Sequence, residues 1–259
     1  MKFGVCNLSV VPVRAEPADT SEMVTQVLFG ELVVIQTEKS GWVQIRMVYD
    51  NYEGWADSKQ IQRIDEGTFN ELNRIEPRFT LELVDVVYNN TANYPLPVLA
   101  GSPIRKIENE HFELAGNEYQ FSGQLSETDP DISIALLLEN AMMFLNAPYL
   151  WGGRSSFGID CSGFTQTVFK LSGIKLLRDA SQQAIQGEAI SLLEEALQGD
   201  LVFFDSSDGL ITHVGIYIGD NQIIHASGKV RIDTLDHQGI YNEESKKYTH
   251  SLRLIKRII

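Results

Sequence analysis

The spacing of hydrophobic residues changes near residue 125, and this change limits the architectures open to the chain. Before it, apolar residues come in short runs rich in branched and aromatic side chains, such as 32–35 and 42–45, separated by turn-forming residues. After it, two stretches have helical spacing, and short strand-like runs follow them. This order predicts an α+β protein that begins with small all-β modules.

Helix signals in the second half are specific. Asp129 and Pro130 have the form of an N-cap followed by a first-turn proline, so we expect a helix over 131–146. A second helix is expected to start near Cys161 and to end near Ser172. Strands are then expected over 201–204, 213–218 and 222–226.

We expect three domains. Residues 1–64 predict a small barrel, because short strands and two Gly-Trp pairs recur at regular intervals. Residues 65–123 are interpreted as a second small β-module, also SH3-like, with a strand over 81–88 and a loop over 89–97. Residues 124–259 form the third domain, in which helices precede strands.

Composition excludes several classes of partner. The net charge of −14, without a Lys/Arg cluster, argues against nucleic-acid binding. Apolar runs are too short to span a membrane and the N-terminus lacks the features of a secretory signal, so we expect a cytoplasmic protein. We also expect it to be a monomer. The two cysteines, Cys6 and Cys161, make neither a disulfide framework nor a metal-ligand cluster, so no metal or cofactor is expected.

Cys161 is the candidate nucleophile. It stands directly before an amphipathic run, which places the sulfur at a helix N-terminus. Backbone N–H groups and the helix dipole favour a thiolate at this position. Because a thiolate is the nucleophilic form of cysteine, the position predicts reactivity.

Two histidines can act on that sulfur if they share one face of a hairpin. A three-residue loop over 219–221 would pair Ile218 with Gln222 and place Gly215 opposite His225. His213, two residues before Gly215, would then lie diagonally across from His225. A two-residue loop would place the histidines on opposite faces.

Two family resemblances follow from these residues. Residues 5–64 resemble a bacterial SH3-like domain, mainly in 25–31 and 52–55. Residues 125–259 resemble the NlpC/P60 family of papain-like cell-wall peptidases; the matching segments are 148–153, 160–163, 199–204, 213–219 and 225–226. The second resemblance implies a triad of Cys161 as nucleophile, His213 as base and His225 as its orienting partner. It also implies that Tyr149 helps to form the oxyanion site.

The order of modules resembles that of the gamma-D-glutamyl-L-diamino acid endopeptidases. This resemblance implies hydrolysis of murein stem peptides that carry a free N-terminal L-alanine, and a role in wall-peptide recycling. It assigns substrate contacts to Trp151, Asp160, Ser162, Asp179, Tyr52 and Glu22, with Glu22 meeting the ammonium. One departure is Ala180, where the family pattern has serine.

Two other functions remain open at this point. One is an amidase or acyltransferase on the same scaffold, which product analysis would distinguish. The other is a non-catalytic wall-binding protein, in which the SH3-like modules bind sacculi without hydrolysis. The presence of all three triad residues argues against a non-catalytic protein.

Overall fold

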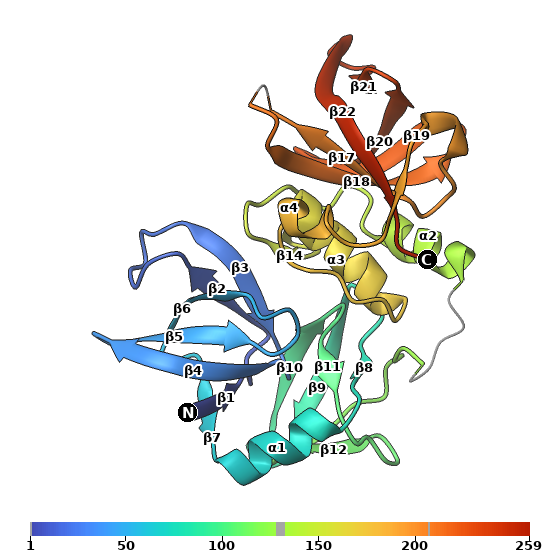
Figure 1. Ribbon diagram of the computed structural model, residues 1–259. Coiled ribbons are helices and arrows are strands. Elements are labelled where there is room, and N and C mark those ends of the chain that lie inside the picture. Colours follow the sequence, from blue (N-terminus) through green and yellow to red (C-terminus); the bar gives the residue numbers. More distant parts are fainter. Residues whose placement is uncertain (1, 128–132, 207) are drawn as a thin grey trace. The chain divides into compact units, whose positions relative to one another are not determined.

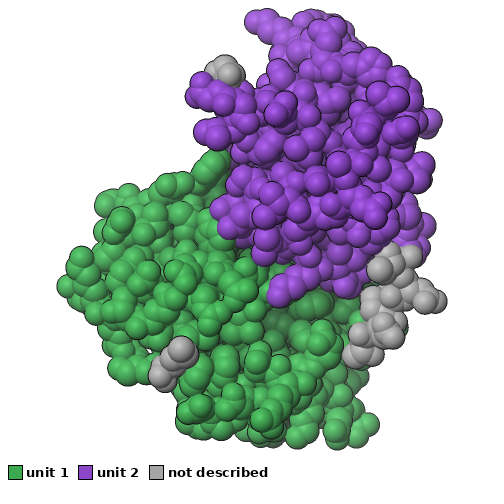
Figure 2. All heavy atoms as spheres, viewed as in Figure 1, with its two compact units in different colours: residues 1–130, 151–156 green, residues 131–150, 157–259 purple. Residues whose placement is uncertain are grey.

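The computed structural model describes residues 2–127, 133–206 and 208–259. The chain divides into two compact units, shown in different colours in Figure 2. Unit 1 comprises Met1–Pro130 and Trp151–Ser156, and unit 2 comprises Asp131–Leu150 and Phe157–Ile259. Six residues of the segment that resembles a peptidase, Trp151–Ser156, therefore belong to unit 1 and not to unit 2. The division into three domains at residues 64 and 123 stays a prediction.

The first part of unit 1 is one antiparallel sheet, as its short alternating runs predict (Figure 1). Its order is β3-β2-β6-β5-β4-β1-β7. The inward side chains of these strands, among them Val27, Val33 and Ile45, enclose a core that also contains Cys6. The strands are β1 Lys2–Val5, β2 Val10–Arg14, β3 Met23–Leu28, β4 Leu32–Lys39, β5 Trp42–Met47, β6 Glu53–Asp57 and β7 Gln62–Ile64.

The second part of unit 1 contains a helix that the sequence analysis does not predict. This helix, α1 (Glu66–Arg74), has Asp65 as its N-cap and buries Phe69 and Leu72. Two small sheets follow, with orders β10-β9-β13-β12 and β11-β8. The strands are β8 Arg78–Phe79, β9 Val84–Asn89, β10 Tyr94–Leu99, β11 Pro103–Ile104, β12 His111–Leu114 and β13 Asn117–Gln120; β14 Arg154–Ser155 also belongs to this unit.

The loop expected over 89–97 is wrong in its second half, because β10 starts at Tyr94. The prolines at 95 and 97 suggested a loop, since proline cannot donate to a sheet. β10 is an edge strand, however, and among the described strands it pairs with β9 alone. In residues two apart along a strand, the backbone nitrogens face the same side. The side on which Pro95 and Pro97 lack an N–H can therefore be the unpaired side of an edge strand.

The two parts of unit 1 share a hydrophobic core. Phe29, which follows β3, lies edge-on to Tyr119 of β13 with ring centroids 5.4 Å apart, and Phe112 stacks on Tyr119 at 5.3 Å. Val5 and Val87 belong to the same buried cluster. The α1 helix adds Phe69, which stacks on Phe3 at 4.1 Å. Aromatic packing therefore joins sequence-distant strands into one unit.

Unit 2 combines helices with a closed antiparallel sheet, so the predicted α+β class is confirmed. The order is β16-β22-β17-β18-β19-β20-β21, and an additional pairing of β22 with β21 closes a six-stranded ring. The elements are α2 Ile134–Met143, β15 Gly158–Ile159, α3 Cys161–Leu171, α4 Ala180–Gln183, β16 Glu188–Ile190, the 3-10 turn η1 Leu193–Glu195, β17 Leu201–Asp205, β18 Ile211–Gly219, β19 Gln222–Ser227, β20 Lys229–Asp236, β21 Gly239–Asn242 and β22 Lys247–Arg257.

The predicted helices and strands of unit 2 are present. The proposed cap at Asp129 and Pro130 lies outside the described residues, and Ser133 is the N-cap of α2, with its side chain accepting from the N–H of Leu136. Helix α3 starts at Cys161, as predicted. Among the described residues, no helix has the length and apolar character needed to cross a lipid bilayer.

Candidate active site

Cys161 is the first residue of α3, and the preceding Asp160 positions it. The Asp160 side chain accepts from the N–H of Gly163 at 2.6 Å, which is the N-cap interaction that starts a helix. Helix α3 packs against β18, and the backbone N–H of Val214 on that strand donates to the Cys161 sulfur. Because His213 precedes Val214, the nucleophile lies beside the strand that carries the expected base.

The surroundings of the Cys161 sulfur favour the thiol over the thiolate. Burial raises the pKa of Cys161 to about 12, and the charge of Asp160 acts in the same direction. The N–H groups of Val214 and Ser162 and the charge of Arg178 lower the pKa, but burial outweighs them. Burial therefore acts against the thiolate that the helix N-terminus alone favours.

The hairpin of β18 and β19 places His213 and His225 on one face by a route different from the predicted one. Gly215 pairs with His225, as expected, but Gly219 rather than Ile218 pairs with Gln222. The loop has only two residues, Asp220 and Asn221, both with positive φ, as a type I′ turn requires. A β-bulge in β18, between Tyr217 and Gly219, adds one residue to that strand. This extra residue offsets the shorter loop, so Gly215 still pairs with His225 and the two histidines share a face.

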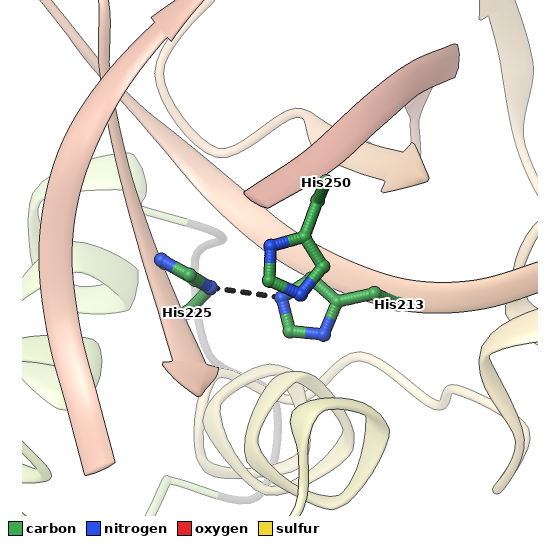
Figure 3. A group of neighbouring side chains, drawn as sticks. All are labelled: His213, His225 and His250. Atoms are coloured by element: carbon green, nitrogen blue, oxygen red, sulfur yellow. Dashed lines mark hydrogen bonds between the residues drawn. The ribbon is translucent and has the colours of Figure 1, made fainter. Parts of the chain in front are cut away.

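His213 and His225 form a direct hydrogen bond. Nε2 of His213 lies 2.8 Å from Nδ1 of His225, and the rings are nearly perpendicular (Figure 3). Both side chains are buried. Burial lowers the pKa of each imidazole, that of His213 well below its usual value. Both rings are therefore neutral near pH 7, and each has one nitrogen that donates and one that accepts.

Asp233 on β20 determines which nitrogen donates. Its Oδ2 lies 3.1 Å from Nε2 of His225, and Arg231 and Asn242 hold the carboxyl group from its other sides. Burial raises the pKa of Asp233, but the hydrogen bonds from His225 and Arg231 outweigh it and lower the pKa overall. A carboxylate only accepts, so Nε2 of His225 donates to Asp233 and Nδ1 of His225 accepts from His213. Nδ1 of His213 then keeps its lone pair and can act as a base.

Asp233 was not predicted, although the sequence contains a signal for it. A hairpin that pairs Ser227 with Lys229 also pairs Ile223 with Asp233 and His225 with Arg231. Because Ile223 and His225 share a face, Asp233 lies diagonally across from His225. Tracing the hairpin that starts at Ser227 would have identified the residue.

His250 on β22 is a third imidazole at the site. Its ring stacks on that of His213, with centroids 4.1 Å apart and planes 24° apart (Figure 3). Its Nδ1 lies 2.9 Å from Oγ1 of Thr249. Burial lowers the pKa of His250 to about 4. Its distance in sequence from the other motifs, and the long β22 that carries it, explain why the sequence analysis does not predict it.

Two of the predicted substrate-binding residues belong to a buried polar network. Arg178, which is 1% exposed, donates to both carboxylate oxygens of Asp160, at 3.0 and 2.6 Å. It also donates to Oγ of Ser162 at 2.9 Å. The network fixes the first turn of α3 beside Cys161. Arg178 was missed because its function depends on this pairing and not on a local motif.

Tyr149 and Asp179 lie near the same helix. The Tyr149 hydroxyl is close enough to Cys161 and Asp160 to interact electrostatically with both, and burial, the largest effect, raises the pKa of Tyr149 well above its usual value. The hydroxyl therefore stays protonated and can donate a hydrogen bond. Asp179 is the N-cap of α4, and its N–H donates to Oε1 of Gln182 at 3.0 Å.

The three remaining predicted residues belong to unit 1. Nε1 of Trp151 donates to Oε1 of Glu22 at 2.6 Å, so the structure brings these two together. Trp151 is 59% exposed. Tyr52 is partly buried and packs against the core of the first sheet.

Arg154 attaches the segment that contains Trp151 to unit 1. Its guanidinium donates to the carbonyl oxygen of Gln26 at 2.7 Å and forms two hydrogen bonds with Glu31, at 2.9 and 3.0 Å. Gly152 has a φ of +76°, and a Cβ there would lie 2.3 Å from the carbonyl oxygen of Met23. A glycine is therefore required at this position.

Comparisons with known proteins agree with this geometry. Residues 146–251 match the NlpC/P60 family, and residues 13–61 match the bacterial dipeptidyl-peptidase Sh3 domain. A Gamma-D-glutamyl-L-lysine dipeptidyl-peptidase of Bacillus subtilis is 32% identical over 237 residues, which cover 85% of this chain and 78% of that protein. The protein of the same name in Bacillus cereus is 31% identical, over 87% of this chain and 74% of that one.

A solved structure shows the same fold. The NlpC/P60 family protein from Bacillus cereus superposes with a TM-score of 0.84 at 23% identity, and the alignment covers 99% of both chains. The matched family region contains Cys161, His213, His225 and Asp233. With two relatives above 30% identity over most of their length, the chain belongs to the NlpC/P60 family and is a cysteine peptidase with an N-terminal bacterial SH3-like domain.

Proposed function

We propose that the protein hydrolyses the gamma-D-glutamyl-L-diamino acid bond of murein stem peptides that have a free N-terminal L-alanine. One observation carries the catalytic part of this proposal. The chain of hydrogen bonds from Asp233 through His225 to His213 leaves a lone pair on Nδ1 of His213. The next residue of the same strand, Val214, donates its backbone N–H to Cys161. A base and a nucleophile on adjacent elements are the requirement for thiol-dependent acyl transfer.

The reaction starts from a neutral thiol and a neutral imidazole. As the sulfur of Cys161 attacks the amide carbon, its proton moves to Nδ1 of His213, and the imidazolium is stabilised through His225 by the Asp233 carboxylate. The backbone N–H of Cys161 and the hydroxyl of Tyr149 donate to the developing oxyanion. His213 then protonates the leaving amine, and water hydrolyses the thioester to regenerate the thiol.

The bond and the end of the peptide are inferred from the relatives. Two of them carry the name Gamma-D-glutamyl-L-lysine dipeptidyl-peptidase, which supports the gamma-D-glutamyl bond and the release of a dipeptide. A dipeptidyl-peptidase needs a group that recognises the substrate ammonium, and a carboxylate is the suitable partner. We assign that role to Glu22, which Trp151 already orients through a hydrogen bond. Contacts of Tyr52, Asp160, Ser162 and Asp179 with the substrate stay predictions.

The physiological setting is also part of the proposal. We place the enzyme in the cytoplasm as a monomer that degrades small imported wall peptides. Specificity for a free amine supports this setting, because intact wall strands carry an acylated L-alanine. The acidic composition suits a small peptide as substrate and not a polyanion.

Peptide hydrolysis tests the proposal directly. The protein is incubated with L-Ala-γ-D-Glu-L-Lys, with L-Ala-γ-D-Glu-meso-diaminopimelate and with the N-acetylated form of each, and the products are identified by mass spectrometry. We expect L-Ala-D-Glu to be released only from the peptides with a free amine. Equal cleavage of the acetylated peptides would exclude the free-amine specificity, and the absence of cleavage at the gamma bond would exclude the assigned reaction.

A further inference from the structure

We infer that His213, His225 and His250 form a binding site for a divalent transition metal ion such as Zn²⁺, and that the bound ion switches off the proposed peptidase chemistry. The inhibitory half of this inference rests on the proposed function. The three side chains come from three different strands, β18, β19 and β22, and converge as Figure 3 shows. One ligand nitrogen from each lies within 4.8 Å of the other two.

The spacing is close to that of a tetrahedral zinc site. Zn–N distances of 2.0–2.1 Å place ligand nitrogens about 3.3 Å apart. Nε2 of His213 and Nδ1 of His225 are 2.8 Å apart, so an ion that enters between them replaces one hydrogen bond and separates the rings slightly. His250 has the longer distance to close. It is the least buried ring of the three, so solvent reaches the cluster at His250.

The hydrogen bond between His225 and Asp233 also has the form found at metal sites. Metal-binding histidines usually donate their other ring N–H to a carboxylate, which fixes the tautomer and orients the ligand nitrogen. Nε2 of His225 lies 3.1 Å from Oδ2 of Asp233, and this leaves Nδ1 of His225 directed at His213. Arg231 and Asn242 hold the carboxylate in place. Asp233, Arg231 and Asn242 therefore already hold His225 in the way that the outer partners of a metal ligand do.

Coordination would inactivate His213 by changing its tautomer. A neutral imidazole carries one proton, and Nε2 of His213 holds it while that atom donates to His225. When Nε2 binds the ion, the proton moves to Nδ1, and no net proton is gained or lost. Nδ1 then has no lone pair and cannot accept the proton of Cys161. Metal and catalysis therefore compete for the same ring.

A binding experiment that needs no enzymatic activity tests the site. Zn²⁺ binding to the Cys161→Ala protein is measured by calorimetric titration. The same titration is made with three further proteins, each of which combines Cys161→Ala with one more substitution: His250→Phe, Asp233→Asn or His111→Phe. Phenylalanine keeps the ring that stacks on His213 but removes the donor nitrogen. His111 is an exposed histidine of unit 1 that pairs with Glu118, and it serves as the matched control.

We expect one ion to bind per chain. His250→Phe should weaken binding by more than about 100-fold, since it removes a ligand, and Asp233→Asn by about 10- to 100-fold, the range for loss of a second-sphere partner. His111→Phe should leave the affinity unchanged. Binding that is equally tight with and without the His250 imidazole, or a loss of affinity in His111→Phe as large as in His250→Phe, would overturn the site.

A kinetic experiment tests inhibition separately. Zn²⁺ is added to the otherwise unmodified enzyme and then removed with a chelator, and hydrolysis of L-Ala-γ-D-Glu-L-Lys is followed. We expect reversible inhibition, with a half-inhibitory concentration at least about tenfold higher in His250→Phe, in line with the affinity loss. If His250→Phe is inhibited at the same concentration, the ion acts on the thiol of Cys161 and the inference is wrong. Because the calorimetric experiment uses no substrate, it decides on the metal site even if this peptide is not cleaved.

Discussion

The two cysteines of the chain are buried to a similar degree, one in each unit, but their surroundings differ. Cys6 is completely buried in unit 1, where its thiol donates to the carbonyl oxygen of Leu8 at 3.2 Å. Burial raises the pKa of Cys6 to about 12, the same value as that of Cys161. Burial and pKa therefore do not distinguish the core residue Cys6 from the candidate nucleophile Cys161.

The neighbours of the two sulfurs make the difference. Glu31 is the charged group that acts on Cys6, and the single histidine in the sequence of unit 1, His111, is an exposed residue that pairs with Glu118. Cys161 starts a helix, receives the N–H of Val214 and lies beside the strand that carries His213. A cysteine acts as a nucleophile because a base and donors lie next to it, whatever its resting pKa.

Removing each sulfur in turn should give the largest difference between the units. We expect Cys161→Ala to lower kcat/KM by at least about 10⁴-fold, because no other group can form the thioester. Cys6→Ala should leave kcat/KM within about twofold and lower the free energy of unfolding by about 1–2 kcal/mol, through lost packing in the core of the first sheet. Peptide hydrolysis and urea denaturation measure these effects. A strong loss of activity in Cys6→Ala at full folding would invalidate the comparison.

The two buried Arg–carboxylate pairs extend the comparison to stability. Arg154 with Glu31 in unit 1 and Arg178 with Asp160 in unit 2 are almost equally buried. Arg154→Met and Arg178→Met should each cost about 3–5 kcal/mol of unfolding free energy, because each removes the guanidinium that balances the charge of a buried carboxylate.

Urea denaturation measures both losses. All three tryptophans belong to unit 1, so tryptophan fluorescence follows Arg154→Met, and circular dichroism follows Arg178→Met. The exposed pair of Arg63 and Glu38 provides the control. Arg63→Met should leave the midpoint unchanged. A shift as large as that of the buried variants would contradict the argument from burial.

Asp233→Asn tests whether the hydrogen-bonded chain from Asp233 through His225 to His213, and not the two histidines alone, makes the surroundings of Cys161 different from those of Cys6. We expect kcat to fall by about 100-fold or more with a small change in KM, because the amide no longer fixes the His225 tautomer or stabilises the imidazolium. Steady-state kinetics over pH 5–9 are the measurement. Asp236 on the same strand interacts with Tyr248 at the surface, and Asp236→Asn is the matched control, with kcat unchanged. An equal loss of kcat in Asp233→Asn and Asp236→Asn would mean that Asp233 has only a structural role.

The smallest effect concerns the resting state of the Cys161 sulfur. Its pKa of about 12 means that the thiolate fraction, and with it the rate of alkylation by iodoacetamide, rises tenfold for each pH unit between pH 7 and 9. The rate is measured by mass spectrometry in the Cys6→Ala background. A rate that is constant across this range would instead indicate a thiolate–imidazolium pair at rest. Native Cys6, in the Cys161→Ala background, should stay unmodified at every pH.

Local patterns predicted the elements that carry the site. The start of α3 at Cys161 and the pairing of Gly215 with His225 follow from an N-cap residue and from strand alternation. The turn between the strands was assigned incorrectly, because a bulge at Ile218 and a shorter loop at Asp220 and Asn221 compensate each other. Such paired irregularities leave no trace in hydrophobic periodicity.

Residues whose role depends on distant pairing were not predicted. Arg178 became visible only when a buried ion pair brought it beside Asp160. The same holds for His250, which reaches His213 because β22 closes the ring of strands. A single charged or aromatic residue outside a motif has no local signal that separates it from a surface residue.

The sequence alone predicted the α+β class and the helix that begins at Cys161, because these depend on side-chain periodicity and on an N-cap residue. The triad of Cys161, His213 and His225 was proposed from a family resemblance and stays a prediction. Only the tertiary structure decided the tautomers of the histidines, the protonation state of the sulfur and the assignment of residues 151–156 to unit 1. These depend on burial and on hydrogen bonds between residues far apart in the chain, and both arise only when the chain has folded.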